Sequence, residues 1–202
     1  MARRKDHSRD ELKDLILDKS WTIVGKNGFA ALTARRIAGE IGYTPGTIYN
    51  LFQSMDDLYL AVNRRTLDLL YSVLSDPECN NPKKPPVENM KKMAASYLRF
   101  SAEYRQHWLM LFNHRMPEHR QTGNLHQGKV ELLFVPLENL LQAYFPPRQS
   151  QKRKMAARVL WASVHGLCFL QETGKISLVD DKAPPSAMAE YLIDTFIAGI
   201  ER

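Results

Sequence analysis

A short stretch between positions 44 and 50 carries side chains that can bind a polyanion without catalysing a reaction. A threonine and a proline suit the cap and the first turn of a helix. A glycine and a second threonine are small, so the helix end can approach another molecule, and its exposed N–H groups favour a phosphate oxygen. A tyrosine hydroxyl and an asparagine amide can contact phosphate or a base edge. The residues of this predicted DNA-contacting turn are Thr44, Pro45, Gly46, Thr47, Tyr49 and Asn50.

A second short helix is predicted immediately before this turn, from Thr33 to Ile41, with Gly42 ending it. Helices this short are marginally stable alone, so they must pack on the longer amphipathic helices that precede and follow them. The pattern predicts a helix-turn-helix, in which the first helix braces the DNA backbone and the second enters the major groove. Thr33, Arg35 and Arg36 begin the bracing helix and can reach the duplex.

Helix signals continue along the chain, and strand signals are nearly absent. Ser8 and Glu11 predict a capping box for the first long helix, which ends at Asn27-Gly28. Prolines between Asp76 and Pro86 exclude a helix there. We therefore expect an all-α protein of about nine helices, with a three-helix DNA-binding domain over 1–65 and a helical ligand-binding and dimerisation domain over 66–202. The predicted helices after the helix-turn-helix cover 54–74, 87–104, 106–116, 129–145 with a kink at Pro136, 151–173 and 186–200, and 117–128 is predicted to be a polar loop.

The composition agrees with a polyanionic partner and a reducing compartment. The net charge is +6, and the isoelectric point is about 9.3. Two cysteines make no disulfide framework, and we expect no signal peptide, because no apolar segment follows the charged N-terminus. No run is long enough to cross a bilayer, so we expect a soluble, cytoplasmic protein without a membrane partner. A basic arm enters the minor groove or remains a solvated tail; it comprises Arg3, Arg4, Lys5 and Arg9.

Catalysis and metal binding find no support in the sequence. The common nucleophile, phosphate-loop, dinucleotide and zinc-protease motifs are absent. Four histidines follow no metal-ligand spacing. We expect no enzyme activity, no metal and no cofactor. These histidines are His107, His114, His119 and His126.

The stretch from Gly28 to Leu58 resembles the DNA-binding domain of the tetracycline-repressor-like (TetR) family of transcriptional regulators. The resemblance implies phosphate contacts at Thr33, Thr47 and Tyr49, and a homodimer. The chain departs from the family pattern at Met55, where a lysine is common, so the resemblance implies no phosphate contact there. It also departs at Leu51, where an aromatic residue or histidine is common, and neither change removes the expected fold. The matching residues are Gly28-Phe29, Thr33, Ile37-Ala38, Ile41-Gly42, Thr44 to Tyr49, Phe52 and Leu58.

The C-terminal part bears a fainter resemblance to the same family. Trp161, His165 and Gly166 are similar to the Trp…His-Gly signature of one class of its C-terminal domains. Aromatic bulk combined with a few polar groups predicts a pocket for a small-molecule effector, although aromatic residues at helical spacing also fill cores. The candidate ligand-binding residues are Tyr104, Trp108, Phe112, Phe134, Trp161, His165 and Gln171.

The last two predicted helices are apolar around most of their circumference. Such helices must be covered on more than one side, which predicts a four-helix dimer interface with two helices from each subunit. A single thick monomer core is the alternative. The candidate interface residues are Val159, Leu167, Leu170, Tyr191, Phe196 and Ile197.

These features together predict a ligand-responsive transcriptional regulator, a repressor by default, with activation left open. A dimer would place two recognition helices about 34–36 Å apart on a palindromic operator, and an effector would release it. The alternative is a non-specific architectural DNA-binding protein. A helical enzyme with a coincidental motif and a ligand-free interaction protein are further alternatives, and the enzyme lacks a convergent set of titratable groups.

Overall fold

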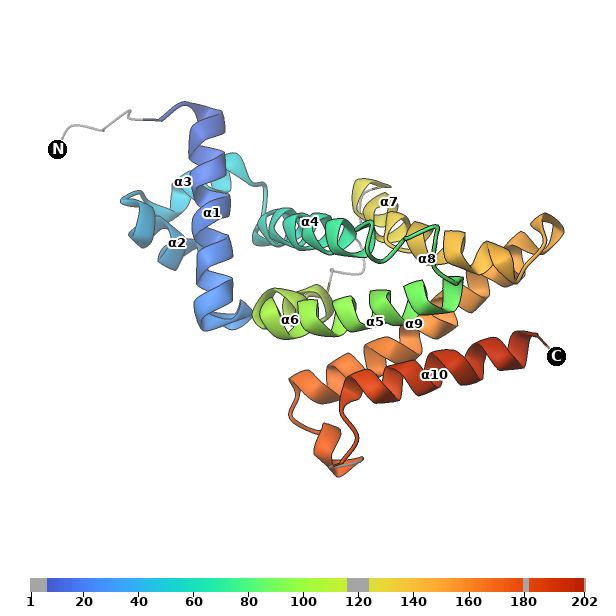
Figure 1. The fold of residues 1–202 in the computed structure, drawn as a ribbon. Helices are drawn as coiled ribbons and strands as arrows, with labels where there is room; N and C mark the ends of the chain where they lie inside the picture. Colours follow the sequence, from blue (N-terminus) through green and yellow to red (C-terminus); the bar gives the residue numbers. More distant parts are fainter. Residues whose placement is uncertain (1–6, 116–123, 180–181, 202) are drawn as a thin grey trace. The chain divides into compact units, whose positions relative to one another are not determined.

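The computed structural model of the chain is built from helices (Figure 1). It describes residues 7–115, 124–179 and 182–201. These residues contain ten α-helices and four short 3-10 helices, and no strand. The expected all-α fold is confirmed. The helices separate into two compact units, one made of residues 1–66 and 104–126 and the other of residues 67–103 and 127–202.

The N-terminal unit surrounds one apolar core. Ile16 and Val24 of the first helix are fully buried there with Ile37 and Ile48. The predicted capping box is present, with Ser8 Oγ accepting from the Glu11 backbone N–H and a Glu11 carboxylate oxygen accepting from the Ser8 backbone N–H. The elements of this unit are α1 (Arg9–Asn27), η1 (Phe29–Ala31), α2 (Ala34–Ile41), α3 (Pro45–Leu51), the first part of α4 (Met55–Leu74) and α6 (Arg105–Asn113).

Helix α6 packs on α1 through a histidine. The His107 ring stacks on Trp21 with 3.7 Å between centroids and an interplanar angle of 20°. Its Nε2 donates to the Trp21 carbonyl oxygen over 2.9 Å. A Cβ at Gly25 would lie 2.9 Å from His107 Cε1, so only glycine fits below the ring without a shift. Burial lowers the pKa of His107, so it packs as a neutral ring.

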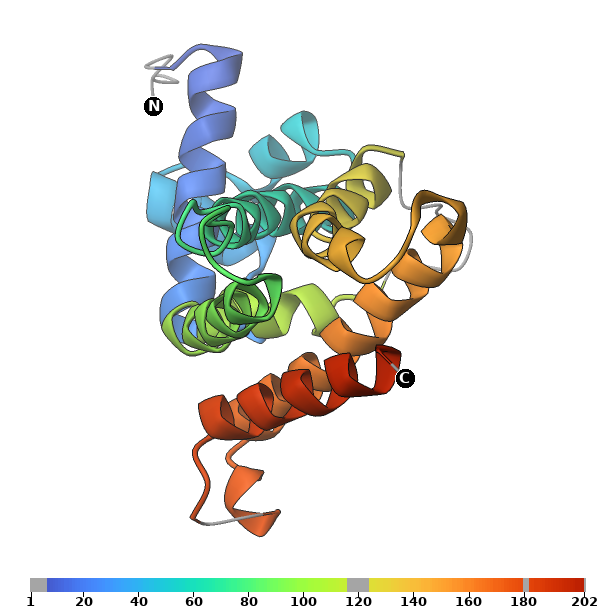
Figure 2. The same ribbon diagram turned by 45° about the vertical axis from the view of Figure 1, so that its right-hand side comes forward.

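The C-terminal unit packs α5 against the last two helices (Figures 1 and 2). Helix α10 lies against both α5 and α9. Ile193 of α10 and Leu160 of α9 are almost fully buried in this core. The elements of this unit are the end of α4, α5 (Pro86–Glu103), α7 (Asn124–Leu132) from residue 127 onward, α8 (Val135–Leu140), η2 (Leu141–Ala143), η3 (Pro147–Gln149), α9 (Ser150–Glu172), η4 (Ile176–Leu178) and α10 (Pro185–Ile200).

The region after α6 differs from the sequence-based expectation. The polar loop predicted to reach Gly128 gives way to α7 at Asn124. The helix predicted over 129–145 is broken at Leu133–Phe134 and restarts as α8, with Pro136 in its first turn. Proline lacks an N–H and favours the first turn of a new helix over the interior of an old one, so the chain breaks instead of kinking. This break adds the helix beyond the nine expected.

Both cysteines lie in the C-terminal unit and are buried as free thiols. Cys79 Sγ lies 3.5 Å from Ser96 Oγ and is in hydrogen-bond contact with it. Burial raises the pKa of the Cys168 thiol to about 12. No helix in the described part of the chain has the length and apolarity that a bilayer span requires.

Candidate nucleic-acid interface

The turn between α2 and α3 has the geometry that the glycine predicts. Gly42 adopts φ 73° and ψ 27°, in the left-handed region. The Tyr43 N–H then donates to the Ala38 carbonyl oxygen over 2.9 Å, which closes the end of α2. Thr44 follows as the N-cap of α3, with Pro45 at its first turn. These contacts fix the angle at which the chain enters α3.

Helix α3 has one buried anchor and an exposed remainder. Ile48 is 0% exposed and holds the helix on the core of the N-terminal unit, whereas Tyr49 is 52% exposed. Asn50 is exposed, and Thr47 is partly exposed. Thr44 Oγ1 lies 3.4 Å from Thr47 Oγ1, so the two hydroxyls lie together. The side chains predicted to contact DNA are therefore on the surface of a helix that its own core positions.

The start of α2 supplies a hydroxyl and two arginines, one of which is paired within the protein. The Thr33 side chain accepts from the Arg36 backbone N–H over 3.3 Å, and its hydroxyl proton can still be donated to a phosphate. Arg36 is occupied within the protein, since Nη2 donates to Asn27 Oδ1 over 2.6 Å and Nε lies 3.5 Å from a Glu40 oxygen. Arg35 is exposed and forms no ion pair within the described residues. Arg35 is therefore the better placed of the two arginines.

The first turn of α1 adds contacts beside α3. His7 Nδ1 lies 3.0 Å from the Tyr43 hydroxyl, within hydrogen-bond distance. The Arg9 guanidinium donates to the Asn50 carbonyl oxygen over 3.4 Å. Arg9 therefore brings positive charge to the end of α3. Arg3, Arg4 and Lys5 of the predicted basic arm lie outside the described residues.

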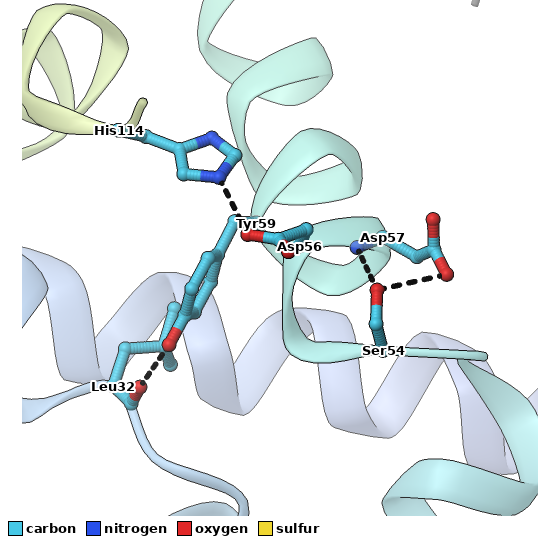
Figure 3. Close-up of polar contacts among 6 residues, drawn as sticks. All are labelled: Leu32, Ser54, Asp56, Asp57, Tyr59 and His114. Atoms are coloured by element: carbon cyan, nitrogen blue, oxygen red, sulfur yellow. Dashed lines mark hydrogen bonds and ion pairs between the residues drawn. The ribbon is translucent and has the colours of Figure 1, made fainter. Parts of the chain in front are cut away.

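A cluster behind the helix-turn-helix connects three helices (Figure 3). His114 follows α6, and its Nε2 lies 3.0 Å from a carboxylate oxygen of Asp56 in the first turn of α4. Tyr59, one turn further along α4, donates its hydroxyl to the Leu32 carbonyl oxygen over 3.1 Å. Ser54 caps α4 by accepting from the Asp57 backbone N–H over 3.2 Å. Tyr59 thereby fixes the residue that precedes the Thr33 cap.

Sequence reasoning missed this supporting cluster. From the sequence, His114 is raised only as a possible metal ligand, and no role is assigned to Asp56 or Tyr59. The ring of His114 lies edge-on to Tyr59, with 5.2 Å between their centroids, and it also meets Phe29. Because 58 residues separate His114 from Asp56, no local pattern indicates the pair.

Two family matches cover the parts of the chain that carry these features. Residues 16–62 match the bacterial regulatory proteins of the tetR family, and residues 90–196 match the tetracyclin repressor-like C-terminal domain. The chain belongs to the TetR family. The membership confirms the resemblance drawn from residues 28–58, and it places the chain among regulators and not among enzymes.

Two relatives are named as uncharacterized HTH-type transcriptional regulators. The TetR-family chain is 28% identical to YerO of Bacillus subtilis over 116 residues, which are 55% of this chain and 39% of YerO. It is 25% identical to Rv0681 of Mycobacterium tuberculosis over 195 residues, which are 94% of this chain and 82% of Rv0681. The chain thus spans less than half the length of the first relative and most of the second.

Solved structures share the fold at low sequence identity. BioQ, crystallised with its double-stranded DNA operator, has a TM-score of 0.64 and 17% identity over 92% of this chain and 98% of BioQ. The multidrug binding protein EbrR, complexed with imidazole, has a TM-score of 0.62 and 20% identity over 95% of this chain and 96% of EbrR. These likenesses show that nearly the whole chain shares its fold with the two solved structures.

The C-terminal unit of this TetR-family chain contains an apolar cavity of about 50 Å³. Phe134 and Trp161, both predicted as ligand-binding residues, line it together, and their rings meet edge to face at 5.5 Å. His165 lies behind Trp161, with its ring stacked on the indole at 5.1 Å. Gln171 does not line the cavity and donates to Glu172 over 2.9 Å.

The other three predicted ligand-binding residues are elsewhere. Tyr104 is the N-cap of α6, and Trp108 and Phe112 lie on α6 in the N-terminal unit. Trp108 is 0% exposed and packs as a core side chain against Phe112. The structure therefore corrects their placement, because the predicted division after residue 65 assigned α6 to the C-terminal domain, whereas it packs on α1.

The predicted dimer residues divide by exposure. Val159 and Tyr191 are 46% and 76% exposed, whereas Ile197 is only 6% exposed and belongs to the protomer's own core. Leu167, Leu170 and Phe196 are partly buried. The structure therefore does not present Ile197 to a partner subunit. Within the described residues, no group of three His, Cys, Asp or Glu side chains could hold a metal ion. His119 and the side chain of His126 lie outside the described residues.

Proposed function

We propose that this TetR-family chain is a ligand-responsive transcriptional regulator, a repressor by default. It acts in the cytoplasm, binding a palindromic operator as a homodimer and releasing it when a small molecule binds. The observation that supports this most directly is the surface of α3, where Thr47, Tyr49 and Asn50 are accessible on a helix anchored by the fully buried Ile48. Residues 1–65 would bind DNA, and residues 66–202 would carry the effector and dimer surfaces, with α6 supporting the DNA-binding part.

The proposed homodimer rests on an apolar seam along α9. Met155 and Val159 are 65% and 46% exposed, and Phe169 is 44% exposed. With the small residues Ala162 and Gly166, they follow the alternating spacing of four and three residues that pairs helices in coiled coils. Among the described residues, a Cβ on Gly166 would meet no atom within 4 Å. A second helix can therefore approach closely at the middle of the seam.

Tyr191 extends this apolar surface onto α10, where it is 76% exposed. Two helices from each subunit would then cover one another as a four-helix interface. Such a dimer carries two copies of α3, and on a palindromic operator these would enter successive major grooves about 34–36 Å apart. Release by an effector requires that it bind the non-DNA-binding conformation more tightly.

DNA binding is tested by fluorescence anisotropy with labelled DNA from upstream of the gene. The double variant Thr47→Ala/Tyr49→Phe removes two hydroxyls that can reach phosphate, each worth about 1 kcal/mol. The loss is about 2 kcal/mol in each subunit, or about 4 kcal/mol in the dimer, so we expect affinity to fall about a thousandfold. The control Thr22→Ala/Tyr71→Phe removes hydroxyls of the same types from α1 and α4 outside α3, and it should bind like the parent chain. Equal affinity of the α3 variant and the control would refute the proposed docking.

Salt dependence and competition separate the operator-specific regulator from the architectural alternative. Arg35→Ala should reduce the slope of log affinity against log salt by about 1 for each phosphate that the arginine neutralises. The control Arg148→Ala, in η3 of the C-terminal unit, should leave the slope unchanged. Random DNA should compete roughly a thousandfold less well than the operator. Equal competition by random DNA would favour the non-specific architectural binder.

A further inference from the structure

The cavity in the C-terminal unit is walled by five helical segments. Leu74 closes one side as the last residue of α4, and Ile193 contributes from α10. The chain around the α7–α8 break supplies a third wall. None of the lining side chains carries a charge. The full lining is Leu74, Met90, Met93, Ala94, Tyr97, Leu133, Phe134, Leu137, Leu160, Trp161, Val164 and Ile193.

The polar group in this wall is already paired and is neutral. The Tyr97 hydroxyl lies 3.0 Å from His165 Nδ1, in a part-buried hydrogen bond. The His165 ring is itself stacked on Trp161. Burial lowers the pKa of His165, so the imidazole is uncharged at neutral pH. This edge of the cavity therefore offers a hydrogen-bonded dipole and no ionic partner.

A cation that lies against the aromatic wall is paired with a carboxylate. The Arg158 guanidinium lies 4.5 Å from the centre of the Phe134 ring. It also donates to a Glu138 carboxylate oxygen over 2.6 Å, and the Glu138 side chain is only 14% exposed. The Arg158–Glu138 pair contributes no net charge to the wall. An ionised ligand entering the cavity would lose its hydration without gaining a counter-charge, which is strongly unfavourable.

Given the effector-controlled function proposed above, on which this depends, we propose that the cavity binds an uncharged, flat apolar molecule of aromatic type. The edge-to-face pair of Phe134 and Trp161 provides the ring surfaces, since aromatic rings favour edge-to-face and offset contacts at such distances. Met90 and Met93 lie on α5 in the same wall, and unbranched thioether side chains adapt to ligands of irregular outline.

The size of the cavity links binding to a change of conformation. Its volume is about 50 Å³, whereas a protein cavity that admits benzene measures about 150 Å³. A ring-sized ligand that is buried completely in the cavity must therefore move the walls apart. The unbranched side chains of Met90 and Met93 can change rotamer to allow this movement. Because the ligand fits only a widened cavity, it binds that conformation preferentially, which is the differential affinity that regulation requires.

The test compares three probes of nearly equal shape on the full chain. These are neutral naphthalene, anionic 2-naphthoate and cationic 2-naphthylmethylammonium, and binding is followed by the fluorescence of Trp161. We expect naphthalene to bind at least tenfold more tightly than either ion. In Trp161→Phe the fluorescence response should disappear, since Trp21 and Trp108 lie in the N-terminal unit. Equal or tighter binding of either ion would overturn the proposal, as would no binding of naphthalene.

Two neighbouring leucines provide a matched pair of variants. Leu133→Phe adds bulk at the cavity wall and should weaken naphthalene binding about tenfold. Leu132→Phe is the control, because Leu132 is 50% exposed and does not line the cavity. If the two variants bind naphthalene equally well, the site is wrong. A melting-temperature increase on adding naphthalene, present in the parent chain and reduced only in Leu133→Phe, supports the proposal even if fluorescence is weak.

The DNA-binding assay tests the proposed regulatory function separately from the proposed ligand chemistry. If the chain binds operator DNA and naphthalene fails to bind, the ligand chemistry is refuted while the regulator stands. If naphthalene binds as expected and the chain binds no DNA, the proposed function fails and the cavity chemistry stands. Release of DNA by naphthalene, at concentrations that saturate the change in Trp161 fluorescence, supports both the proposed ligand chemistry and the proposed regulatory function.

Discussion

Substituting Gly25 by alanine should destabilise the N-terminal unit, although alanine is the better helix former. In α1 the exchange itself contributes about 0.5–1 kcal/mol of stability. The new Cβ, however, would lie 2.9 Å from His107 Cε1 and 3.5 Å from Nε2. The ring has little freedom to retreat, because it is stacked on Trp21 and donates to the Trp21 carbonyl oxygen. Overpacking costs about 1–3 kcal/mol, and removal of the hydrogen bond about 1 kcal/mol.

We therefore expect Gly25→Ala to lower the free energy of unfolding by about 1–3 kcal/mol. The effect of Gly25→Ala on the free energy of unfolding should change sign when the His107 ring is removed. In a His107→Ala background, Gly25→Ala should raise the free energy of unfolding by about 0.5–1 kcal/mol, since only the helix propensity remains. The two single variants and the double variant form a cycle whose coupling reports the contact of α1 with α6.

Urea unfolding followed by far-UV circular dichroism measures these values, at one protein concentration because association would shift them. Gly39→Ala is a control on α2, where a Cβ would meet no described atom within 4 Å. It should stabilise in both backgrounds. Should Gly25→Ala stabilise the parent chain as Gly39→Ala does, the account of α6 held against α1 by His107 is incorrect.

Three further outcomes follow from contacts in the two units. Tyr59→Phe should lower the free energy of unfolding by about 1 kcal/mol, because the Leu32 carbonyl oxygen loses its donor, whereas the exposed Tyr49→Phe should not; equal urea midpoints for the two variants would contradict this. Burial lowers the pKa of His107, so the unfolded chain binds a proton that the native chain resists, and stability is lost as the pH falls below about 6.5. His107→Gln should flatten this loss between about pH 7 and pH 5, and an unchanged slope in urea titrations would exclude His107 as its source. Val159→Glu should shift the chain from dimer to monomer in sedimentation equilibrium, because it would bury a charge in the α9 seam of the dimer. The control Lys152→Glu, at the exposed start of α9, should remain dimeric. If both variants are dimers, the α9 seam is not the interface.

The helix-turn-helix could be predicted from the sequence because its signals are local. Thr33 accepts from a backbone N–H three residues ahead, and Gly42 supplies the left-handed turn within its own segment. Ile48 is the apolar residue between Thr47 and Tyr49 in one short helix. Each of these features depends on residues only a few positions apart, so their spacing carries the structural information.

The contacts of α6 could not be predicted in the same way. His107 bonds to Trp21 across 86 residues of sequence, and His114 to Asp56 across 58. Neither histidine differs in local context from one on a surface. The placement of Trp108 in the N-terminal unit follows from these contacts, and not from its own apolarity, which would suit a core or a ligand pocket equally well.

The break between α7 and α8 was visible only in part. Pro136 predicts a disturbance, but α7 already ends at Leu132, before the proline is reached. Just beyond that end, the Phe134 ring meets Trp161 from α9, and the Arg158 guanidinium lies over the same ring. The break itself agrees with Pro136, which cannot donate to the Leu132 carbonyl oxygen four residues earlier. The ring contacts of Phe134, which join residues far apart in the sequence, could not be predicted from it.

The thiol of Cys168 has a consequence for the signals to which this regulator can respond. With a pKa of about 12, only on the order of one thiol in 10⁵ is ionised at neutral pH. Oxidants and electrophiles attack the thiolate, so they find almost none at this position, and Cys79 is 1% exposed. We therefore expect peroxide to leave both buried thiols reduced, so that neither cysteine would act as a redox sensor beside the small-molecule response proposed above.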